Sequence, residues 1–572
     1  MAVALPQATV DTTYPGATGK VWPVAAGGDL QGALNNAQPG DIVSVAAGAS
    51  FTGPYTLPTK TGSGWVLVVS SALASLPPPG TRVGPGNATL MPKILGPNGN
   101  IALGAAAGAH HFRFVGIEFS PAPGAGQHTL ISIGTNAGSI SALPHHIVFD
   151  RCYVHGDPAG QGATFWGLVP DGQFMAIIDS YFSNWRMPLL ASDPSGNETT
   201  AIKIINGAGP YKIANNYIEA AGQSVMFGGQ DPNIQGVIPT DLEIRGNYMT
   251  KRLSWRLHDP SFTGTAPTIK EVFELKSARR VLIDGNIFEH SWKSSDHDGH
   301  VVQFTPRNQT GGAPWVVVED VTFTHNIVRQ GTNGFFMLGA DYTHPSGPLQ
   351  RVLIQNNLIY GIGSFPENGG IWIGVLVAVR DGAMNVTIDH NTAFQTGDVL
   401  HASVVNGAKN TGWVFTNNVS DGNVSSEAAA GPAAALATSF PGVVWTKNVL
   451  LDGTASAYPV GNWFPPGTTP VVNAAAGGDD YHLVAGSPYK GAGTDGLDVG
   501  ANIDAVMAAT ANVISGAPGP VSPPPPPPPP PSPPPPPPPP GTVTPTWTVD
   551  FTATGGTITV LKNGVVVFSG GS

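Results

Sequence analysis

The sequence predicts an all-β solenoid, a parallel β-helix, from a repeated phrase, the place of Asn in that phrase and a low content of charge. Between Gly116 and Asn448 one phrase recurs eleven times: an apolar pair, two residues, a small residue or Asn, and a second apolar pair. The intervals run from 27 to 40 residues with a mean of about 33, and such periods are typical of stacked repeats. Each repeat is expected to form one coil, whose strands bury their inner face only when the coils stack.

Asn occupies the key position in eight copies: Asn216, Asn247, Asn286, Asn326, Asn357, Asn391, Asn418 and Asn448. Asn tolerates a left-handed backbone at a sharp corner, and stacked coils would align its amides in a hydrogen-bonded ladder. Cys152 takes the same position in an earlier copy, where we expect a small packing residue. Antiparallel hairpins would show turn signals roughly every 8–12 residues, so the longer spacing favours the solenoid.

Composition and the N-terminal pattern agree with this fold. Only 11% of the residues are charged, against roughly 25% in an average protein. A helix is expected over residues 29–37, because Leu30, Ala33, Leu34 and Ala37 share one face and a Pro-Gly pair follows. The open end of a solenoid needs a cap, and this helix is predicted to supply it.

Composition divides the chain into a leader (1–19), the β-helix with its caps (20–512), a proline-rich linker (513–541) and a small C-terminal β segment (542–572). The linker contains runs of nine and eight prolines, which favour an extended, stiff spacer. In the last segment, Asn563-Gly564 predicts a hairpin between two strands. We expect these strands to belong to a larger domain, to dock on a partner or to associate with a second copy.

The cellular location is inferred from the absence of visible targeting and membrane segments and from the types of module in the chain. No signal-peptide pattern is visible at the N-terminus, and no apolar run reaches the length of a membrane span. The β-helix, the proline spacer and the appended strands are typical of secreted, cell-surface or virion proteins. A net charge of −11 disfavours nucleic acid and acidic membranes as partners.

The cap helix, the sequence QPGDIVSVAAGASFTGPYTLP at residues 38–58 and the Asn-bearing coils resemble the right-handed, single-stranded parallel β-helix proteins of the pectate-lyase-like superfamily. The resemblance covers roughly residues 20–505 and implies that fold. The superfamily includes lyases, hydrolases, esterases, epimerases, adhesins and phage tail depolymerases. It therefore implies a glycan partner without fixing the reaction.

Basic residues concentrate between residues 243 and 309, which hold ten of the 26 Lys and Arg residues. Two of the longest repeat intervals, 39 and 40 residues, fall in the same stretch, so loops are expected there, and loops on a rigid scaffold often carry function. The stretch resembles the catalytic region of the β-helix lyases that cleave dermatan or chondroitin sulfate and alginate. In both, Glu residues precede a Lys-Ser pair, here Lys276-Ser277, and an Arg, here Arg307, lies on the next coil.

Carried over, the resemblance implies that Lys276 is the base and that Arg307 neutralises the uronate carboxylate. These lyases have two acidic Ca²⁺ ligands. Glu271 matches one of them, Ile269 stands at the position of the other, and Glu274 lies nearby. Ca²⁺ is therefore the expected cofactor, with Glu271 and Glu274 as its ligands. The residue types suit elimination, because the carboxylate must be neutralised before a base can take the proton beside it.

Other residues of the basic stretch are expected to bind the substrate: Arg279, Arg280, His290, Trp292, His300 and Trp255. Lys270, Arg279 and Arg280 would lower the pKa of Lys276, and the tryptophans would stack on sugar rings. The alternative interpretation is structural. Lys276 would then pair with Glu271 or Glu274 as part of a solvated charged face, and Arg307 would only hold a turn. The tryptophans would be partly buried coil residues.

Two histidine motifs have two interpretations each. Asp296-His297-Asp298-Gly299-His300 alternates carboxylates with imidazoles and predicts either a metal site or a polar loop. His110-His111 and His145-His146 open two successive repeats, where stacking in a ladder is favoured over metal binding.

Two functions follow from these patterns. The first is an extracellular polysaccharide lyase that cleaves uronate-containing glycans by β-elimination. The alternative is a non-catalytic glycan-binding surface protein, an adhesin or a tail-fibre or tailspike protein. The paired Asp, Gly-His-Gly and Arg-x-Lys motifs of polygalacturonase-type hydrolases are absent as a set, which disfavours that class.

Overall fold

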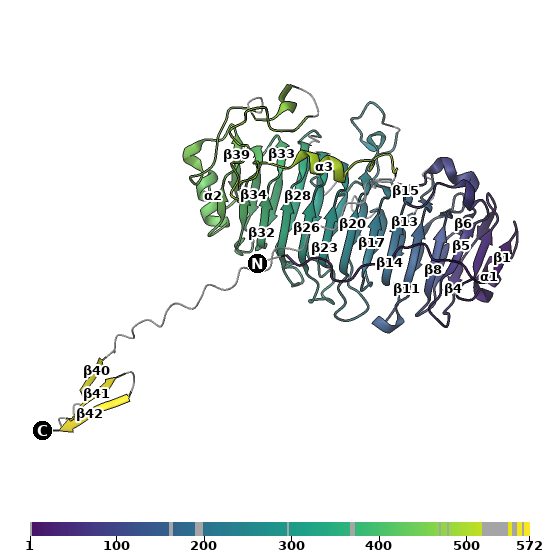
Figure 1. The fold of residues 1–572 in the computed structure, drawn as a ribbon, viewed down its shortest axis with the longest axis horizontal. Coiled ribbons are helices and arrows are strands. Elements are labelled where there is room, and N and C mark those ends of the chain that lie inside the picture. Colours follow the sequence, from purple (N-terminus) through teal and green to yellow (C-terminus); the bar gives the residue numbers. More distant parts are fainter. Residues whose placement is uncertain are drawn as a thin grey trace. The chain divides into compact units, whose positions relative to one another are not determined.

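The computed structural model describes residues 3–158, 164–188, 198–262, 264–294, 297–365, 372–467, 471–476 and 480–517, and the backbone of three strands near the C-terminus. The chain divides into two units, residues 1–522 and 523–572. The larger unit is the predicted parallel β-helix (Figure 1). Each coil passes in chain order through three sheets, which we name A, B and C, and equivalent strands of successive coils pair in parallel.

Sheet A has fourteen strands: β1 (Val21–Val24), β2 (Ile42–Val45), β5 (Val66–Ser70), β8 (His110–Val115), β11 (His145–Asp150), β14 (Gln173–Ile178), β17 (Tyr211–Ala214), β20 (Thr240–Arg245), β23 (Ala278–Asp284), β26 (Val318–Thr324), β29 (Leu349–Gln355), β32 (Met384–Asp389), β35 (Val414–Thr416) and β38 (Val444–Thr446). Sheet B has thirteen: β3 (Ser50–Thr52), β6 (Lys93–Gly96), β9 (Glu118–Pro121), β12 (Tyr153–His155), β15 (Tyr181–Trp185), β18 (Tyr217–Ala220), β21 (Tyr248–Thr250), β24 (Ile287–Ser291), β27 (Ile327–Gly331), β30 (Leu358–Ile362), β33 (Thr392–Gln395), β36 (Val419–Asp421) and β39 (Val449–Leu451). Sheet C has twelve: β4 (Tyr55–Leu57), β7 (Leu103–Ala105), β10 (Gln127–Ile133), β13 (Thr164–Pro170), β16 (Thr200–Ile204), β19 (Gln223–Phe227), β22 (Phe273–Leu275), β25 (His300–Phe304), β28 (Asn333–Leu338), β31 (Val377–Arg380), β34 (Leu400–Ser403) and β37 (Val424–Ser426).

Inward side chains form continuous apolar columns through the stack. In sheet C, Phe273 lies between Val225 of the preceding coil and Val302 of the next, and all three are buried. Because side chains alternate between the two faces of a strand, the residues between these positions point outward. The outer face of each sheet is therefore free to carry polar groups.

The predicted asparagine ladder is confirmed. Asn247 Nδ2 donates to Asn286 Oδ1 at 2.9 Å, and the same bond links successive asparagines from Asn216 to Asn448. The assignment of the left-handed backbone to these asparagines was wrong. The residue before each of them has the positive φ, for example 51° at His325 and 60° at Gly246. The ladder asparagine itself then bonds the main chain of the preceding coil, as Asn247 Nδ2 does to Ile213 O.

The N-terminal end of the β-helix is capped as predicted. Helix α1 (Leu30–Asn36) begins after Asp29, whose Oδ1 accepts from Gly32 N at 2.7 Å, a standard N-cap bond. Leu30 and Leu34 are buried in the solenoid core. Near the other end, α2 (Pro432–Ser439) packs against β37.

Residues 3–19, expected as a leader, lie against sheet A, and we call them the N-terminal strap. Ala4 N donates to Asp320 Oδ1 at 3.2 Å, and Gln7 N donates to Asp241 Oδ1 at 2.9 Å. Farther along, Thr12 O accepts from Arg113 Nη1 at 3.0 Å. The strap therefore crosses sheet A from β26 back to β8.

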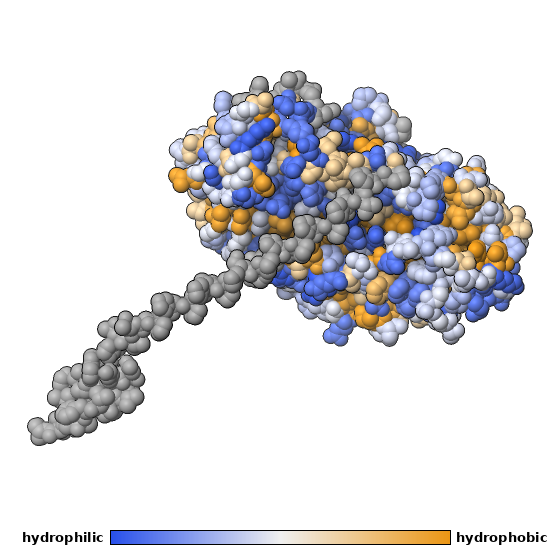
Figure 2. Space-filling view, in the orientation of Figure 1, coloured by the Kyte–Doolittle hydropathy of each residue, from blue (hydrophilic) through white to orange (hydrophobic). Residues whose placement is uncertain are grey.

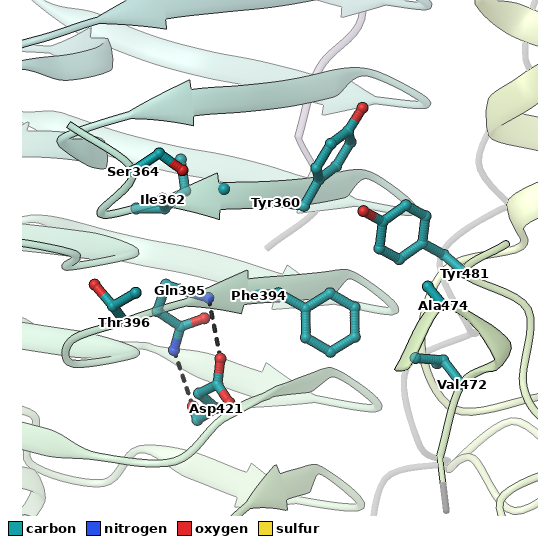
Figure 3. A pocket seen from close by; sticks show the side chains of 11 residues that line it. Tyr360, Ile362, Ser364, Phe394, Gln395, Thr396, Asp421, Val472, Ala474 and Tyr481 are labelled. Atoms are coloured by element: carbon teal, nitrogen blue, oxygen red, sulfur yellow. Dashed lines mark hydrogen bonds between the residues drawn. The ribbon is translucent and has the colours of Figure 1, made fainter. Parts of the chain in front are cut away.

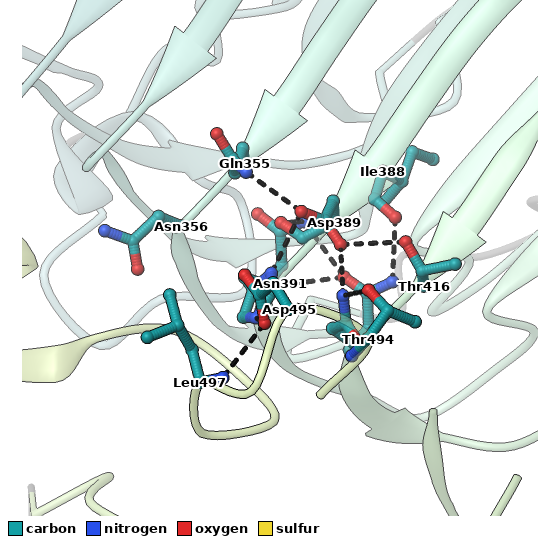
Figure 4. Close-up of polar contacts among 12 residues, drawn as sticks. Gln355, Asn356, Ile388, Asp389, Asn391, Thr416, Thr494, Asp495 and Leu497 are labelled. Atoms are coloured by element: carbon teal, nitrogen blue, oxygen red, sulfur yellow. Dashed lines mark hydrogen bonds and ion pairs between the residues drawn. The ribbon is translucent and has the colours of Figure 1, made fainter. Parts of the chain in front are cut away.

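Residues 489–517, the C-terminal strap, return along the corner between sheets A and B. Thr494 Oγ1 accepts from Asn417 Nδ2 at 2.9 Å, beside the polar network around Asp389 (Figure 4). Helix α3 (Ile503–Ala509) covers Ile287, Ile327 and Leu358 with Ile503 and Val506, and Val513 O accepts from Arg82 Nη2 at 2.9 Å. This strap spans coils from β35 back to the loop before β6.

The smaller unit contains three antiparallel strands, β40 (Trp547–Phe551), β41 (Thr557–Lys562) and β42 (Val565–Gly571). They agree with the strands predicted for this segment. The proline runs and the Asn563-Gly564 turn lie outside the described residues.

The face of the molecule shown in Figure 2 intermixes small hydrophilic and hydrophobic areas. This mosaic agrees with a surface built from few charged residues. Among the described residues, no helix is long and apolar enough to cross a membrane.

Candidate functional site

A cluster of buried charged residues lies on the outward face of sheet C, between β16 and β25. Lys203 pairs in register with Met226, Met226 with Glu274, and Glu274 with Gln303. Strands lie about 4.8 Å apart, so Lys203 and Glu274 are separated by roughly 10 Å along the outer face. We call Lys203, Glu271, Glu274 and Lys276, with their immediate partners, the sheet C cluster.

Two carboxyls form the centre of this cluster. Glu271 Oε1 accepts from Gln223 Nε2 at 2.9 Å. Glu274 Oε1 accepts from Thr305 Oγ1 at 2.8 Å and lies 3.1 Å from Lys276 Nζ. Both glutamates are almost fully buried. Burial of two neighbouring carboxyls opposes the ionisation of both.

The second oxygen of each carboxyl, Oε2, has no hydrogen-bond partner among the described residues. Two ionised carboxylates only accept hydrogen bonds, so a proton on Glu274 would supply a donor that this pair otherwise lacks. Burial and the adjacent charge of Glu271 raise the pKa of Glu274 to about 8. Burial opposes the charge on Glu271, but the bond from Glu274 and the charges of His297 and Lys270 hold the pKa of Glu271 well below its ordinary value.

The surroundings shift the pKa values of Lys203 and Lys276 in opposite directions. Burial lowers the pKa of Lys203 to about 7, and its Nζ lies 3.9 Å from the ring centre of Trp166, a cation–π distance. Burial would also lower the pKa of Lys276, but the carboxyls of Glu274 and Glu271 raise it. The predicted lowered pKa of Lys276 was therefore wrong, because its neighbours are carboxyls rather than arginines.

The residues of the cluster do not suit calcium. Calcium prefers six to eight oxygen ligands, whereas Lys276 Nζ already contacts Glu274 and Lys270 pairs with Glu198. Ile269, at the other expected ligand position, is buried in an apolar group. The charged ammonium group of Lys276, which already contacts Glu274, would repel a cation.

Arg307 lies beside the cluster on the next coil. Its backbone N donates to Lys276 O at 3.0 Å. Its Nη1 lies 3.5 Å from Asp341 Oδ1, and 40% of its side chain is exposed. It is therefore open to a ligand that approaches from solvent.

The histidines of residues 296–300 border the carboxyls. His297 Nδ1 lies 3.6 Å from Glu271 Oε2. Burial lowers the pKa of His300 to about 3, so this imidazole is neutral at physiological pH. Asp298 Oδ1 lies 3.9 Å from Lys293 Nζ, and Asp296 lies outside the described residues.

The structure does not bring Arg279, Arg280 or His290 to the cluster. Arg279 Nε donates to Glu319 Oε1 at 2.5 Å, and Arg280 makes two bonds to Asp241 at 2.6 and 2.9 Å, all on sheet A. His290 lies on sheet B, where its ring nitrogens contact Lys251 O at 3.0 Å and Gln330 Oε1 at 2.7 Å. The chain turns from sheet C to sheet A after Lys276, which separates these side chains.

Trp255 and Trp292 are 1% and 4% exposed and pack with Ile269 and Phe365. Their rings belong to an apolar group at the corner between sheets B and C and offer no open face for sugar stacking. Half-buried Trp166, which the sequence did not single out, lies at the cluster instead.

The two histidine pairs on sheet A stack as predicted. His110 lies over His145 with ring centres 4.7 Å apart, and His111 lies over His146 at 4.5 Å. Ligand atoms of His111, His145 and His146 lie within 4.8 Å of one another. However, a metal binds in the plane of an imidazole, and an ion between two parallel stacked rings would lie outside both planes.

No protein-family model and no curated protein sequence matches the chain. A PL6 family alginate lyase resembles it in structure, with 11% identity, a TM-score of 0.45, and coverage of 85% of this chain and 57% of that one. A pectate lyase matches with 12% identity, a TM-score of 0.34 and coverage of 85% and 96%. A tailspike protein of the E. coli bacteriophage HK620, in complex with a pentasaccharide, matches with 12% identity, a TM-score of 0.33 and coverage of 76% and 74%. The chain thus spans little more than half the length of the alginate lyase.

Proposed function

We propose that this protein acts on glycans and cleaves uronate-containing polysaccharides by β-elimination at the sheet C cluster. The observation that supports the proposal is that Lys203 and Glu274 lie two strands apart in register on one outward face of sheet C; burial lowers the pKa of the lysine and raises that of the carboxyl. Elimination needs a base for the proton beside the uronate carboxylate and an acid for the departing oxygen. Two groups that titrate near neutral pH meet both needs.

In this mechanism the neutral amine of Lys203 takes the proton from C5 of the uronate. The electron pair left on C5 forms the C4–C5 double bond as the C4–O bond breaks, and the departing oxygen takes the proton of Glu274. Lys276, which its carboxyl neighbours keep charged, and Arg307 neutralise the uronate carboxylate and so make the C5 proton more acidic. Lys276 therefore neutralises the carboxylate in this mechanism, whereas the sequence analysis expected it to be the base.

The carboxyl pair fits elimination better than glycoside hydrolysis. In glycosidases the two carboxyls stand roughly 5 Å or more apart on either side of the scissile bond. Glu271 and Glu274 instead lie side by side, close enough for each to shift the pKa of the other, which leaves no room for a sugar between them. A non-catalytic role, with the cations holding an acidic sugar, is the alternative.

A panel of alginate, polygalacturonate, hyaluronan and dermatan sulfate tests the proposal. We expect ultraviolet absorbance from the unsaturated product with at least one of them. Lys276→Ala should abolish this signal, and Arg307→Ala should raise KM and lower kcat, since each would lose contact with the carboxylate before and during proton removal. Arg279→Ala is the matched control, because its guanidinium lies on sheet A.

Each remaining outcome has a separate meaning. Binding without product, lost in Lys276→Ala, would support the non-catalytic alternative. Neither binding nor product with any of the four polysaccharides would contradict a glycan site at the cluster. Loss of activity in Arg279→Ala would show that the effect arises from folding.

A further inference from the structure

A separate pocket of about 360 Å³ opens on sheet B, in coils that follow the sheet C cluster along the axis. Its walls come from β30, β33 and β36 and from Val472, Ala474 and Tyr481, which follow the last coil. Tyr360 is three coils beyond Glu271, so the pocket and the cluster are separated by roughly 14 Å along the axis. The proposed elimination does not use this pocket.

One end of the pocket is aromatic. Tyr481 lies beside Tyr360 and Phe394, with ring centres 5.0 and 5.7 Å apart (Figure 3). Arg329 Nη1 donates to the Tyr360 hydroxyl at 2.9 Å, which fixes that ring. All three rings are half-buried, so each keeps part of its surface open.

The other end is polar. Figure 3 shows Ser364, Gln395, Thr396 and Asp421 there. Gln395 N and Nε2 donate to Asp421 Oδ2 and O at 3.1 and 3.0 Å. The buried Gln395 Oε1 has no hydrogen-bond partner among the described residues. The pocket therefore has one apolar end and one end able to exchange hydrogen bonds.

The surroundings of the polar end are acidic. An adjoining hollow of about 350 Å³ shares Gln395, Thr396 and Asp421 and adds Asp398 and Asp452. None of the described residues that line the two hollows is Lys or Arg. The lining offers a uronate carboxylate no free counter-charge, because Arg329, which holds the Tyr360 hydroxyl, is already paired with Glu289 at 2.8 Å. The sheet C cluster, in contrast, supplies cations.

We propose that this pocket binds an uncharged pyranose ring of a glycan, with the apolar ring face against Phe394 and Tyr481 and the hydroxyl edge toward Gln395 and Asp421. A pyranose has the same division between an apolar face and polar edges, and small-molecule sites combine apolar walls with a few placed polar groups. The inference rests on the proposed function only in taking the ligand to be a glycan. It assigns uncharged and acidic sugars to two different sites.

Saturation-transfer NMR with cellohexaose, mannohexaose, chitohexaose and galactohexaose at millimolar concentration tests the pocket. We expect at least one to bind wild-type protein, and Phe394→Leu or Tyr481→Ala to weaken its binding about tenfold. Phe394→Leu keeps an apolar side chain of similar volume but removes the flat ring, so it is less disruptive to folding than Tyr481→Ala. Thermal melting checks that both variants are folded. Tyr342→Ala, an exposed tyrosine elsewhere, should bind as wild type does.

The pocket and the proposed elimination fail in different ways. Lys276→Ala should leave the binding of the neutral sugar unchanged, and Phe394→Leu should leave elimination unchanged. The pocket proposal is overturned if none of the four sugars binds, or if Phe394→Leu and Tyr481→Ala both bind as wild type. Competition by hexagalacturonate at this pocket would overturn it equally.

Discussion

Sheets A and C both carry opposite charges on neighbouring coils, but the two groups of residues differ in how completely they are paired. On sheet A, Arg351 makes bonds of 2.7 and 2.8 Å to the two oxygens of Asp320, and Arg280 does the same to Asp241. Although burial opposes it, these arginines lower the pKa of both aspartates. On sheet C, Glu271 and Glu274 each keep one oxygen without a bond from the described residues.

This difference separates a structural role from a chemical one. A planar guanidinium satisfies both oxygens of a carboxylate at once, which leaves no group poised to exchange a proton. A lysine ammonium is a point charge that loses its proton more readily when it is buried. The pairing pattern, rather than the number of charges, therefore distinguishes the two sheets.

Among the changes that test this comparison of the two sheets, Lys203→Met has the largest expected effect. It should lower kcat/KM about 10²- to 10⁴-fold, the usual contribution of a general base, without loss of folding. Because the pKa of Lys203 is lowered in the folded chain, its charge opposes folding, most strongly below pH 7, so the variant should melt at the same or a higher temperature there. Lys212→Met, on β17 of sheet A, is the control. Unchanged turnover in Lys203→Met would contradict its role as the base.

Asp241→Ala should show the opposite pattern on sheet A. It removes the partner of Arg280 and of Gln7 N, so the free energy of unfolding should fall by about 1–3 kcal/mol while kcat/KM stays unchanged. Chemical denaturation measures the first quantity, with exposed Asp504→Ala as control. A loss of activity without a loss of stability would erase the distinction between the sheets.

The pH dependence of kcat/KM sharpens the comparison further. Lys203 must be neutral and Glu274 protonated, so kcat/KM should rise up to about pH 7 and fall above about pH 8, by at most tenfold per pH unit on either side. Arg279→Ala should keep this profile. A flat profile between about pH 5 and 9 would count against both assignments.

The smallest expected effect is that of metal removal. Lys276 and Arg307 supply the positive charge in the proposed reaction, so EDTA should change kcat/KM by less than about twofold. Added Ca²⁺ is the control for nonspecific effects of the chelator. A loss of activity in EDTA that Ca²⁺ restores would return Glu271 and Glu274 to the role of metal ligands.

The fold was predictable because every repeat carries the same short phrase, which forms the corner between sheets A and B in each coil. The repeated phrase sets the register of the ladder. In adjacent pairs such as Asn215-Asn216, however, the sequence does not show which residue adopts the positive φ at the corner. Of the residues that lie at or beside the sheet C cluster, the sequence singled out Glu271, Glu274 and Lys276, which are close together in the chain, and Arg307 on the next coil, which only the family resemblance indicated. Lys203 comes from two coils earlier, and only the register of β16, β19 and β22 brings it near. Sequence proximity misplaced Arg279 and Arg280, because a corner separates them from Lys276.

The two straps change how the stack of coils holds together. In a simple solenoid each coil touches only its neighbours, so the ends can fray one coil at a time. Here Ala4 is bonded to the coil of Asp320, and Val513 is bonded to Arg82, which precedes β6. For a terminal coil to unfold, the N-terminal or C-terminal strap must also detach, and each strap is hydrogen-bonded to coils far along the axis. The straps thus act as long-range couplings in a nearest-neighbour array, and they favour unfolding of the β-helix as one cooperative unit.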